Sequence, residues 1–362
     1  MAFIELDGDK LSHNYAFLNQ LFAKHQVKWG TVSKLLCGHK PFLQELLNLG
    51  MKQILDSRVS NLKAVKQLDP QIETVYIKPP AKRALKSIVK YADISLNTEL
   101  QTIRLLSEEA QNQNKTHKVI IMIELGDLRE GIMGENLVEF YEEVFRLKNI
   151  NIIGLGTNLS CLNGILPNAD KLVQLSLYKQ LIEAKFNRKI PLVSGGTSVT
   201  IPLLKMNQIP GGVNHFRVGE TLFRGNNLLE EKEYPGMKQD VFKLYAEIIE
   251  LVEKPIVPSG IAGANVQGDN PDFSQSDIGK TTYRAILDIG LLDIDTKHMN
   301  PTDKKIKLGG ASSDMIVVDL GPYKPKYKVG DLISFSLSYM GVLGIMNSKY
   351  IDKRIKKTVL NK

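Results

Sequence analysis

The sequence predicts an α/β protein in which a (β/α)8 barrel is followed by a mostly antiparallel β domain. Between about residues 26 and 218, short β-branched runs alternate with longer amphipathic stretches, which is typical of parallel strands joined by helices. After about residue 240, strand-like runs follow one another and are separated by glycine and proline. The 362 residues exceed one average domain. We therefore expect the barrel at residues 6–235 and the β domain at residues 1–5 and 236–362.

Eight short apolar runs supply the strands of the expected barrel, and the stretch after each run is long enough for a parallel crossover. These runs are residues 28–33, 51–56, 73–78, 92–96, 118–124, 151–156, 190–194 and 213–218. Helical periodicity lies between them, for example at 41–49 and 100–111. A third helix is expected at 137–147, with Phe140, Val144 and Leu147 on its buried face. Eight such repeats are the number that closes a barrel of this kind.

The β domain is predicted from four further runs, at residues 247–257, 283–294, 314–321 and 331–337. A long loop rich in Gly, Asn and Asp, at residues 259–281, separates the first two runs, and loops of this length are usually functional or disordered. The N-terminal run at residues 2–6 precedes the barrel, and we expect it to join the β domain. The basic tail at residues 349–362 is expected to be a solvated end of the chain.

Composition excludes several classes of protein. Hydrophobic residues make up 43% and charged residues 24%, which excludes a disordered chain, a collagen and a coiled-coil rod. No apolar run approaches the ~20 residues of a membrane helix, and the N-terminus lacks the apolar core of a signal peptide. Cys37 and Cys161 are too few for a disulfide framework and are expected to be small buried residues, which favours the reducing cytoplasm. A nucleic-acid partner would rest on the net charge of +8 alone. We expect no nucleic acid, membrane or metal partner.

Active sites of such barrels lie where strands end and loops begin. The loops after the last two strands are the usual phosphate site, and here they read SGGTS at 194–198 and RVGE at 217–220. Glycines leave backbone amides unobstructed, and the hydroxyls add further donors. The alternative for each loop is an ordinary tight turn with a helix cap.

Lys34 follows the first apolar strand. Burial disfavours the charged form of an amine and makes it a candidate nucleophile for an imine, whereas a lysine that reaches solvent is the alternative. A lysine and a phosphate cradle in one barrel mouth together point to a phosphorylated aldehyde cofactor, pyridoxal 5'-phosphate.

Eight motifs, in order along the chain, carry a resemblance to a known family. They are IELDGDKLSHNY, TVSKLLCG, ELGDLREG, GLGTNLSC, VSGGTS, HFRVGE, RAILDIG and SSDMIVVDLG. The chain resembles the alanine racemases, which are pyridoxal phosphate enzymes with a barrel and a β domain, and it looks closest to their ornithine racemase branch. The resemblance implies an isomerase that interconverts L- and D-amino acids, with ornithine or another basic amino acid as substrate. It also implies a homodimer with shared active sites.

The resemblance assigns roles to individual residues. Lys34 would hold pyridoxal phosphate as an imine and act as one acid/base on the substrate α-carbon. Arg217 would face the pyridine nitrogen, and because an arginine does not give up its proton it would keep that nitrogen unprotonated. Asp314, the second residue that we expect to be catalytic, would come from the partner subunit. The other cofactor contacts implied are the backbone amides of Gly219 and Glu220 and the side chains of Ser198, Tyr339, Arg129 and Asn158.

Each of these roles has a structural alternative. Asp314 could only cap a turn before the strand that follows it. Tyr339 could be a core tyrosine with a satisfied hydroxyl. Arg129 could form an ion pair with Asp127 or Glu130.

The sequence departs from the family at the second base. Alanine racemases have a tyrosine there, whereas the nearest segment here, residues 264–268, offers Gln267, whose amide does not titrate. Tyr283 lies in a predicted strand. An aspartate of the long loop, Ser312 or Ser313, or a one-base mechanism through Lys34 are the open alternatives.

A basic substrate requires a carboxylate for its buried ammonium. The candidates are Asp269, Asp272, Asp277, Glu124 and Asp127. Without such a partner, alanine or serine becomes the better substrate. The alternative from another class is a pyridoxal-phosphate-binding protein without turnover. Small relatives of that kind lack the β domain of ~120 residues that is expected here, so its presence favours an enzyme. A non-enzymatic RNA-binding protein would rest on the charge alone.

Overall fold

The computed structural model describes residues 2–261, 263–264, 268 and 272–358. By its internal contacts the chain divides into two compact units. The first comprises Met1–Asp9 and Asp240–Lys362, and the second comprises Lys10–Gln239. We call them the β unit and the barrel unit. Among the described residues, no helix combines the length and the apolarity that crossing a membrane requires.

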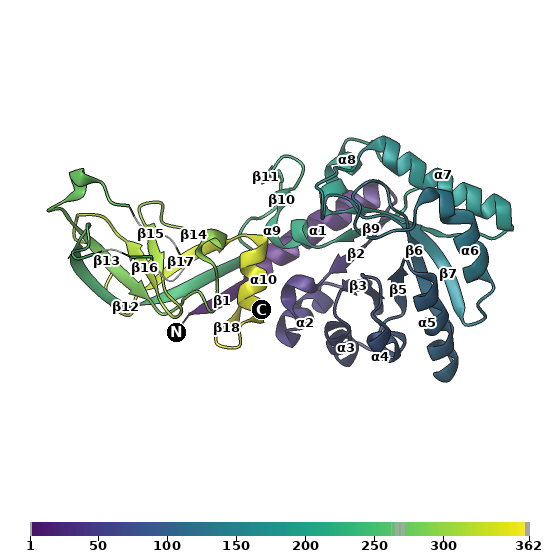
Figure 1. Ribbon diagram of the computed structural model, residues 1–362, viewed down its shortest axis with the longest axis horizontal. Helices are drawn as coiled ribbons and strands as arrows, with labels where there is room; N and C mark the ends of the chain where they lie inside the picture. Colours follow the sequence, from purple (N-terminus) through teal and green to yellow (C-terminus); the bar gives the residue numbers. More distant parts are fainter. Residues whose placement is uncertain (1, 262, 265–267, 269–271, 359–362) are drawn as a thin grey trace. The chain divides into compact units, whose positions relative to one another are not determined.

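The barrel unit is built on eight parallel strands that close on themselves (Figure 1). They are β2 (Lys28–Val32), β3 (Gln53–Asp56), β4 (Glu73–Tyr76), β5 (Ile94–Asn97), β6 (His117–Met122), β7 (Ile150–Gly156), β8 (Leu192–Thr197) and β9 (His215–Val218). The ring closes where β9 pairs with β2, with Thr31 opposite Val218. The predicted (β/α)8 barrel is confirmed, and each strand lies on one of the predicted runs because parallel strands are buried on both faces.

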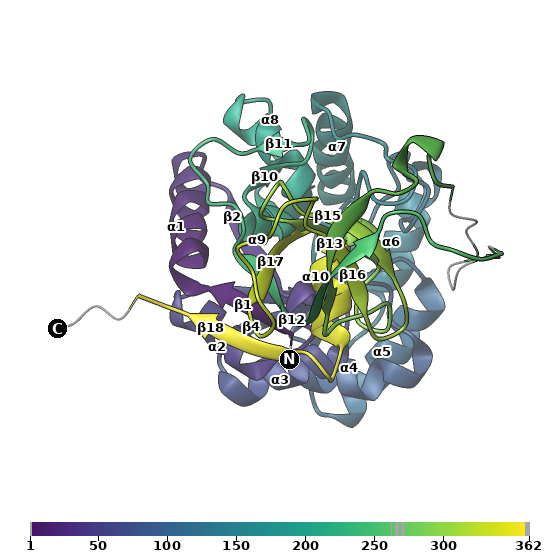
Figure 2. The same ribbon diagram turned by 90° about the vertical axis from the view of Figure 1, so that its left-hand side faces the viewer.

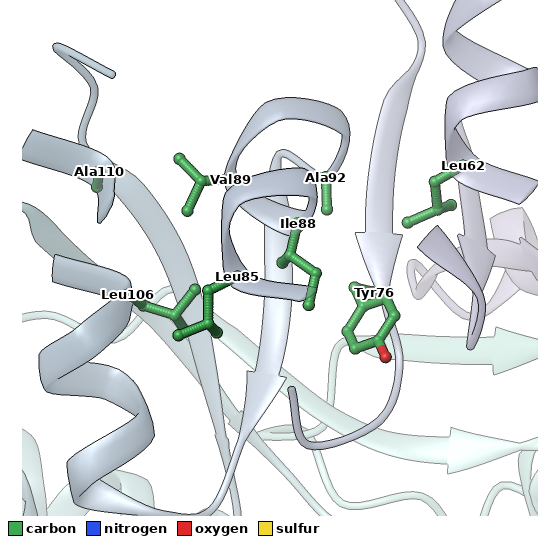
Figure 3. Packing of buried hydrophobic residues seen from close by; sticks show 8 residues of the cluster. All are labelled: Leu62, Tyr76, Leu85, Ile88, Val89, Ala92, Leu106 and Ala110. Atoms are coloured by element: carbon green, nitrogen blue, oxygen red, sulfur yellow. The ribbon is translucent and has the colours of Figure 1, made fainter. Parts of the chain in front are cut away.

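Helices cover the outside of the barrel. They are α1 (Gly8–Lys24), α2 (Lys40–Asn48), α3 (Val59–Leu68), α4 (Leu85–Tyr91), α5 (Leu100–Asn112), α6 (Leu137–Phe145), α7 (Ala169–Phe186), α8 (Ile201–Lys205) and α9 (Glu220–Arg224). Figure 3 shows one part of this packing, in which side chains of α3, α4 and α5 cluster with Tyr76 of β4. Ile88 and Leu106 are fully buried there, and truncating such a side chain to alanine costs about 2–5 kcal/mol.

The buried face of α6 differs from the prediction. Leu137, Tyr141 and Val144 are buried, whereas Phe140 and Leu147 are only half-buried. The helix ends at Phe145, so Leu147 lies beyond it. The predicted and the observed residues both follow the spacing i, i+4, i+7, and the observed set starts one turn earlier, at Leu137. Phe140 therefore lies at the edge of the buried face of the helix.

The β unit contains an eight-stranded sheet (Figure 2). Its strands are β1 (Phe3–Asp7), β12 (Phe242–Pro255), β13 (Thr281–Leu287), β14 (Met299–Pro301), β15 (Lys307–Ala311), β16 (Ile316–Asp319), β17 (Leu332–Leu337) and β18 (Asp352–Lys356), and one helix, α10 (Tyr339–Asn347), follows β17. The main path runs β14-β17-β12-β13-β16-β15 with antiparallel pairing throughout. β1 joins it by pairing antiparallel with β12, so the prediction for the N-terminal run is confirmed.

The basic tail is not simply a solvated end. Residues Asp352–Lys356 form β18, which pairs in parallel with β1. Most side chains of β18 are exposed, so the strand is held by its backbone hydrogen bonds rather than by apolar burial. The guanidinium of Arg354 adds a contact by lying 3.8 Å from the centre of the Phe3 ring. The prediction was wrong because a polar edge strand shows no alternation of apolar residues.

Candidate active site at the carboxyl ends of the barrel strands

Lys34 follows the carboxyl end of β2 by two residues. The chain leaves β2 at Val32 and makes one turn of 3-10 helix over Lys34–Leu36, which Cys37 closes in a left-handed conformation. The Ser33 amide donates to the carbonyl oxygen of Leu55 over 2.8 Å, which fixes the start of this turn against β3. The side chain of Lys34 is half-buried. These backbone contacts therefore place the Cα of Lys34 at the end of the strand, where the sequence predicted it.

A buried carboxylate next to Lys34 was missed in the sequence. Asp56, the last residue of β3, accepts hydrogen bonds from Ser33 Oγ (2.8 Å), the Arg58 amide (2.9 Å) and Asn61 Nδ2 (3.2 Å). Burial raises the pKa of the Asp56 carboxyl, while these donors and the charge of Lys34 act in the opposite direction. The sequence did hold a signal for Asp56, because an aspartate that ends the strand-forming run QILD is placed at the rim of a barrel.

Arg217 in β9 is buried in the barrel. Its Nη1 donates to the carbonyl oxygen of Ser194 (2.8 Å) and to Ser194 Oγ (2.6 Å), and its Nη2 donates to the carbonyl oxygen of Thr157 (2.6 Å). Among the described residues, no carboxylate pairs with this guanidinium, and Glu130, which pairs with Arg129, acts on Arg217 only through its charge. Burial lowers the pKa of Arg217 to about 10, so it remains charged at neutral pH. A buried cation held only by neutral acceptors is costly, which favours a further acceptor from a ligand.

The segments that follow β8 and β9 lie together. The prediction of a loop at 194–198 was wrong in part, because β8 continues to Thr197 and only Ser198 follows it. Ser198 Oγ accepts hydrogen bonds from the amides of Gly219 (3.2 Å) and Thr221 (3.3 Å), which joins the two segments. Gly219 also packs against β2, since a Cβ there would lie 3.0 Å from that of Val32. The Glu220 carboxylate pairs with Arg224 of its own helix. The structure thus brings Ser198, Gly219 and the amide of Glu220 together at one point of the rim.

Two carboxylates that were candidates for binding the substrate ammonium instead organise the loops after β6 and β7. Glu124 accepts from the amides of Leu128 (3.0 Å) and Arg129 (3.2 Å) within its own loop. Asp127 is buried and accepts backbone hydrogen bonds across to the other loop, from the amides of Cys161, Leu162, Asn163 and Ile165. Burial alone would raise the pKa of Asp127, yet these amides lower it. Both side chains are therefore committed to the protein backbone.

Arg129 and Asn158 project from these two loops. Arg129 is exposed and forms a bidentate ion pair with Glu130, which is the structural alternative considered for it, and this pair raises its pKa against the effect of burial. Asn158 Nδ2 and Thr157 Oγ1 are buried without a hydrogen-bond partner among the described residues. Buried polar atoms are rarely left unpaired. Next to Arg217, they indicate that a polar ligand completes this rim.

The remaining predicted residues lie in the β unit. Asp314 sits in the turn between β15 and β16; its side chain is exposed and accepts from Ser313 Oγ (2.7 Å). Tyr339 is the first residue of α10 and is half-buried. Tyr283 lies in β13, as predicted. Asp272 is exposed, and Asp277 pairs with Lys280 over 3.2 Å.

Part of the long loop lies outside the described residues. This applies to Gln267 in the segment nearest to the family's second base, and to Asp269. Elsewhere, the expectation that both cysteines are buried was wrong: Cys161 is exposed and Cys37 is half-buried, and the two form no disulfide. Within the described part of the chain, no group of three or more His, Cys, Asp or Glu side chains could hold a metal ion.

Comparisons with known proteins agree with this architecture. The sequence profile of the family described as alanine racemase, N-terminal domain, matches residues 6–227. Over 353 residues the chain is 38% identical to an ornithine racemase of Acetoanaerobium sticklandii, a match that covers 97% of this chain and 99% of that protein. It is 32% identical over 322 residues to a lysine racemase of Thermotoga maritima, covering 89% of each.

Solved structures show the same fold. An alanine racemase of Clostridium difficile 630 superposes with a TM-score of 0.73 at 16% sequence identity, covering 98% of this chain and 95% of that one. An alanine racemase of Bartonella henselae with covalently bound pyridoxal phosphate gives a TM-score of 0.73 at 16% identity, with 98% and 99% covered. At such identity these structures support the fold and not the details of the site.

Proposed function

The chain belongs to the alanine racemase family and is an amino-acid racemase, and from this premise we propose that it racemises ornithine or another basic amino acid with pyridoxal 5'-phosphate as its cofactor. The buried Arg217 carries the proposal for the cofactor. Its guanidinium donates only to neutral oxygens, and among the described residues no carboxylate forms an ion pair with it. A neutral ring nitrogen is an acceptor that fits this position.

The residues at the strand ends suit the rest of the cofactor. Lys34 is the amine that would attach it, and Ser198 with the backbone amides of Gly219 and Glu220 would hold its phosphate. Asn158, whose buried amide nitrogen lacks a partner, would contact the ring, and Arg129 and Tyr339 are the further contacts that the resemblance implies. When bound, pyridoxal phosphate supplies a conjugated ring that stabilises negative charge on the substrate α-carbon.

The protein's own groups would handle the protons. Lys34 would take the α-proton on one face or return it, because its amine is placed at the rim by the turn that follows β2. Arg217 would donate a hydrogen bond to the ring nitrogen without transferring its proton, since the guanidinium remains charged at neutral pH. It would thereby leave that nitrogen unprotonated and restrain side reactions. Asp314, exposed on its hairpin turn, is proposed to complete the site of a partner subunit in a homodimer.

A basic substrate is favoured by the two relatives, which are named an ornithine racemase and a lysine racemase. Asp127 is disfavoured as the partner for the substrate ammonium because four backbone amides donate to its two oxygens. Glu124, whose Oε2 accepts from the Arg129 amide alone, stays a candidate with Asp272 and Asp277, and with Asp269, which lies outside the described residues. A cytoplasmic location is also part of the proposal, and the two free thiols fit it.

The test is proton NMR of the enzyme loaded with pyridoxal phosphate, incubated in heavy water with single L-amino acids. Loss of the α-proton signal reports proton exchange without presupposing the product. We expect rapid exchange for ornithine or lysine and slow exchange for alanine and serine. Exchange of alanine and serine alone would contradict the basic substrate. If no member of a full panel exchanged although the cofactor was bound, the protein would bind it without turnover.

A further inference from the structure

The barrel unit holds two buried serine–histidine pairs of the same local chemistry, one inside the barrel and the other on the helix-covered outer face of β5 and β6. Ser194 Oγ lies 2.8 Å from Nδ1 of His215, and Ser95 Oγ lies 2.9 Å from Nε2 of His117. All four side chains are buried. Only the first pair reaches the candidate active site, because Ser194 Oγ also accepts from Arg217.

The first pair belongs to a longer chain of hydrogen bonds. After Arg217, Ser194 and His215, the imidazole Nε2 lies 2.9 Å from Gln53 Oε1, and Gln53 Nε2 donates to Glu73 Oε2 over 2.7 Å. We call these five residues the relay. The second pair has no such extension: Ser95 Oγ accepts from Asn97, and the contacts end there.

The two ends of the relay fix the direction of every hydrogen bond in it. A guanidinium can only donate, and an ionised carboxylate can only accept. Gln53 therefore presents its NH2 group to Glu73 and its oxygen to His215. The imidazole then carries its proton on Nε2, and its Nδ1 accepts from the Ser194 hydroxyl. All donors point away from Arg217 and toward Glu73.

The relay runs from Arg217, near the carboxyl ends of the barrel strands, to their amino ends at the opposite mouth of the barrel. Gln53 and Glu73 are the first residues of β3 and β4, and His215 is the first residue of β9. These three residues line a pocket of about 850 Å³, whose wall also includes Lys28 and Lys118. Lys118 Nζ lies 3.5 Å from the second oxygen of Glu73. The relay thus links a buried cation to a carboxylate at the solvent-facing end.

The link to Glu73 partly compensates Arg217 for the absence of a directly paired carboxylate among the described residues. Its immediate acceptors are neutral, yet the relay passes through polarisable groups in a low-dielectric interior, where chains of hydrogen bonds reinforce one another. His215 suits the middle position because it is neutral: burial, followed by the charges of Arg217 and Lys28, lowers its pKa to about 3. A charged imidazole would donate from both nitrogens and would break the direction of the relay.

We propose that Ser194, His215, Gln53 and Glu73 orient the guanidinium of Arg217 toward the cofactor, so that His215 is a positioning residue of the active site that acts from the far mouth of the barrel. The proposal rests on the proposed function, in which Arg217 faces the ring nitrogen. Its competitor is a purely structural role, in which both serine–histidine pairs only satisfy buried polar groups on the barrel strands.

The test uses three single variants of the full chain. His215→Leu removes both hydrogen bonds of the imidazole, whereas His215→Gln can restore them because its amide oxygen and nitrogen can take the places of Nδ1 and Nε2. His117→Leu is the matched control at the pair that does not reach Arg217. We measure the dissociation constant of pyridoxal phosphate and the visible absorption of the bound cofactor. His215→Leu should weaken cofactor binding about tenfold and shift the absorption band, since it removes support from a charged donor.

The other two variants should retain the wild-type spectrum and affinity. Equal effects of His215→Leu and His117→Leu would overturn the proposal in favour of a structural role. A His215→Gln variant as defective as His215→Leu would overturn it as well. If His215→Leu does not fold, His215→Gln, Ser194→Ala and its counterpart Ser95→Ala carry the same comparison.

A second measurement needs no cofactor. Nitrogen-15 NMR of the histidine-labelled protein, with the His215 signal assigned by its loss in His215→Gln, reports which ring nitrogen carries the proton. We expect the proton on Nε2 at neutral pH. A proton on Nδ1 would contradict the relay. If the protein failed to bind pyridoxal phosphate at all, the proposed function would fall while this measurement still decided the relay.

Discussion

The barrel unit and the β unit bury different kinds of side chain. Among the described residues, all the buried polar and charged side chains except Thr282 lie between Lys10 and Gln239, in the barrel unit. The β unit has an apolar interior, which includes Leu244, Ile316 and Phe335. Buried polar groups contribute less to folding than apolar ones, and they are costly unless every one is hydrogen-bonded.

This contrast marks where the chain departs from the most stable sequence for its fold. The β unit follows the rule of apolar inside and polar outside, which is what stability alone requires. The barrel unit breaks that rule at Arg217, Asp56 and the two buried histidines, and such departures concentrate at functional sites. The comparison makes four predictions, in which barrel variants should have large and specific effects and β-unit variants smaller ones.

The largest effect is expected for Lys34→Ala. It removes the amine that attaches the cofactor and moves the proton, so racemisation should fall by at least about 10³-fold. The fold should persist because the side chain is only half-buried. Racemisation rates and reduction of the bound cofactor with borohydride measure the effect. Lys86→Ala, an exposed lysine of α4, is the control and should behave as wild type. Covalent attachment that persisted in Lys34→Ala would contradict the assignment.

The second effect is a loss of barrel stability in acid. Burial lowers the pKa of His117 to about 4 and that of His215 to about 3. The unfolded chain takes up both protons below about pH 6.5, and the folded barrel does not. The free energy of unfolding should therefore fall as the pH falls from 6.5 toward 4, by about 2 kcal/mol for each histidine at pH 5.

Urea unfolding at pH 7 and pH 5 measures this loss. The fluorescence of Trp29 follows the barrel unit, because this is the single tryptophan of the chain and it lies in β2. The double variant His117→Leu/His215→Gln should remove most of the pH dependence in this range. A dependence that remained unchanged in the double variant would show that other groups cause it.

The third effect concerns carboxylates that organise loops in each unit. Asp127 of the barrel is buried and accepts four backbone hydrogen bonds, so Asp127→Ala should cost about 2–3 kcal/mol by leaving amides unpaired. Asp303 of the β unit is partly exposed and accepts from the Lys305 amide and Tyr327. Asp303→Ala should cost about 1 kcal/mol or less, since water can replace the aspartate.

Hydrogen exchange followed by mass spectrometry localises the two losses. Protection should decrease at residues 159–165 in Asp127→Ala and at residues 303–306 in Asp303→Ala. Because the Asp127 pKa is lowered, its contribution should be present above about pH 4 and disappear as the pH falls below that value. Equal losses of stability in the two variants would remove the distinction between the units.

The sequence predicted the barrel better than its interior. Continuous apolar runs mark buried parallel strands, and the ends of these runs mark the rim, so Lys34, Ser198 and Gly219 could be proposed as rim residues from their position. The relay was missed because its contacts depend on register. Ser194 meets His215 only because β8 and β9 pair at those residues. The motif HFRV did hold a signal, since alternate residues of a strand share a face and so place His215 beside Arg217.

Several strands of the β unit were not predicted, for another reason. Short or polar strands such as β14, β15 and β18 carry no apolar alternation, and backbone pairing with neighbours distant in the sequence stabilises them. Asp314 and Tyr339 were assigned through the resemblance alone. Their surroundings, a hairpin turn and the start of α10, give no physical signal of a catalytic role.

The smallest effect is therefore expected at Asp314. Asp314→Asn keeps the size of the side chain and an acceptor for Ser313 Oγ, and it removes only the charge. If the carboxylate completes the site of a partner subunit, kcat should fall about tenfold, at or below the low end of what a positioned acid or base contributes. The absorption of the bound cofactor should not change. Asp352→Asn, an exposed aspartate of β18, is the control.

Mixed subunits separate a shared site from a local effect. Racemase activity should rise above that of the Asp314→Asn enzyme when inactive Lys34→Ala subunits are mixed with Asp314→Asn subunits, because one of the two sites of a mixed dimer then has both residues intact. Activity that did not increase on mixing would place both residues in the same subunit's site. An Asp314→Asn enzyme with wild-type kcat would leave this aspartate the role of a turn residue, and it would confine the chemistry to the unit that buries its polar groups.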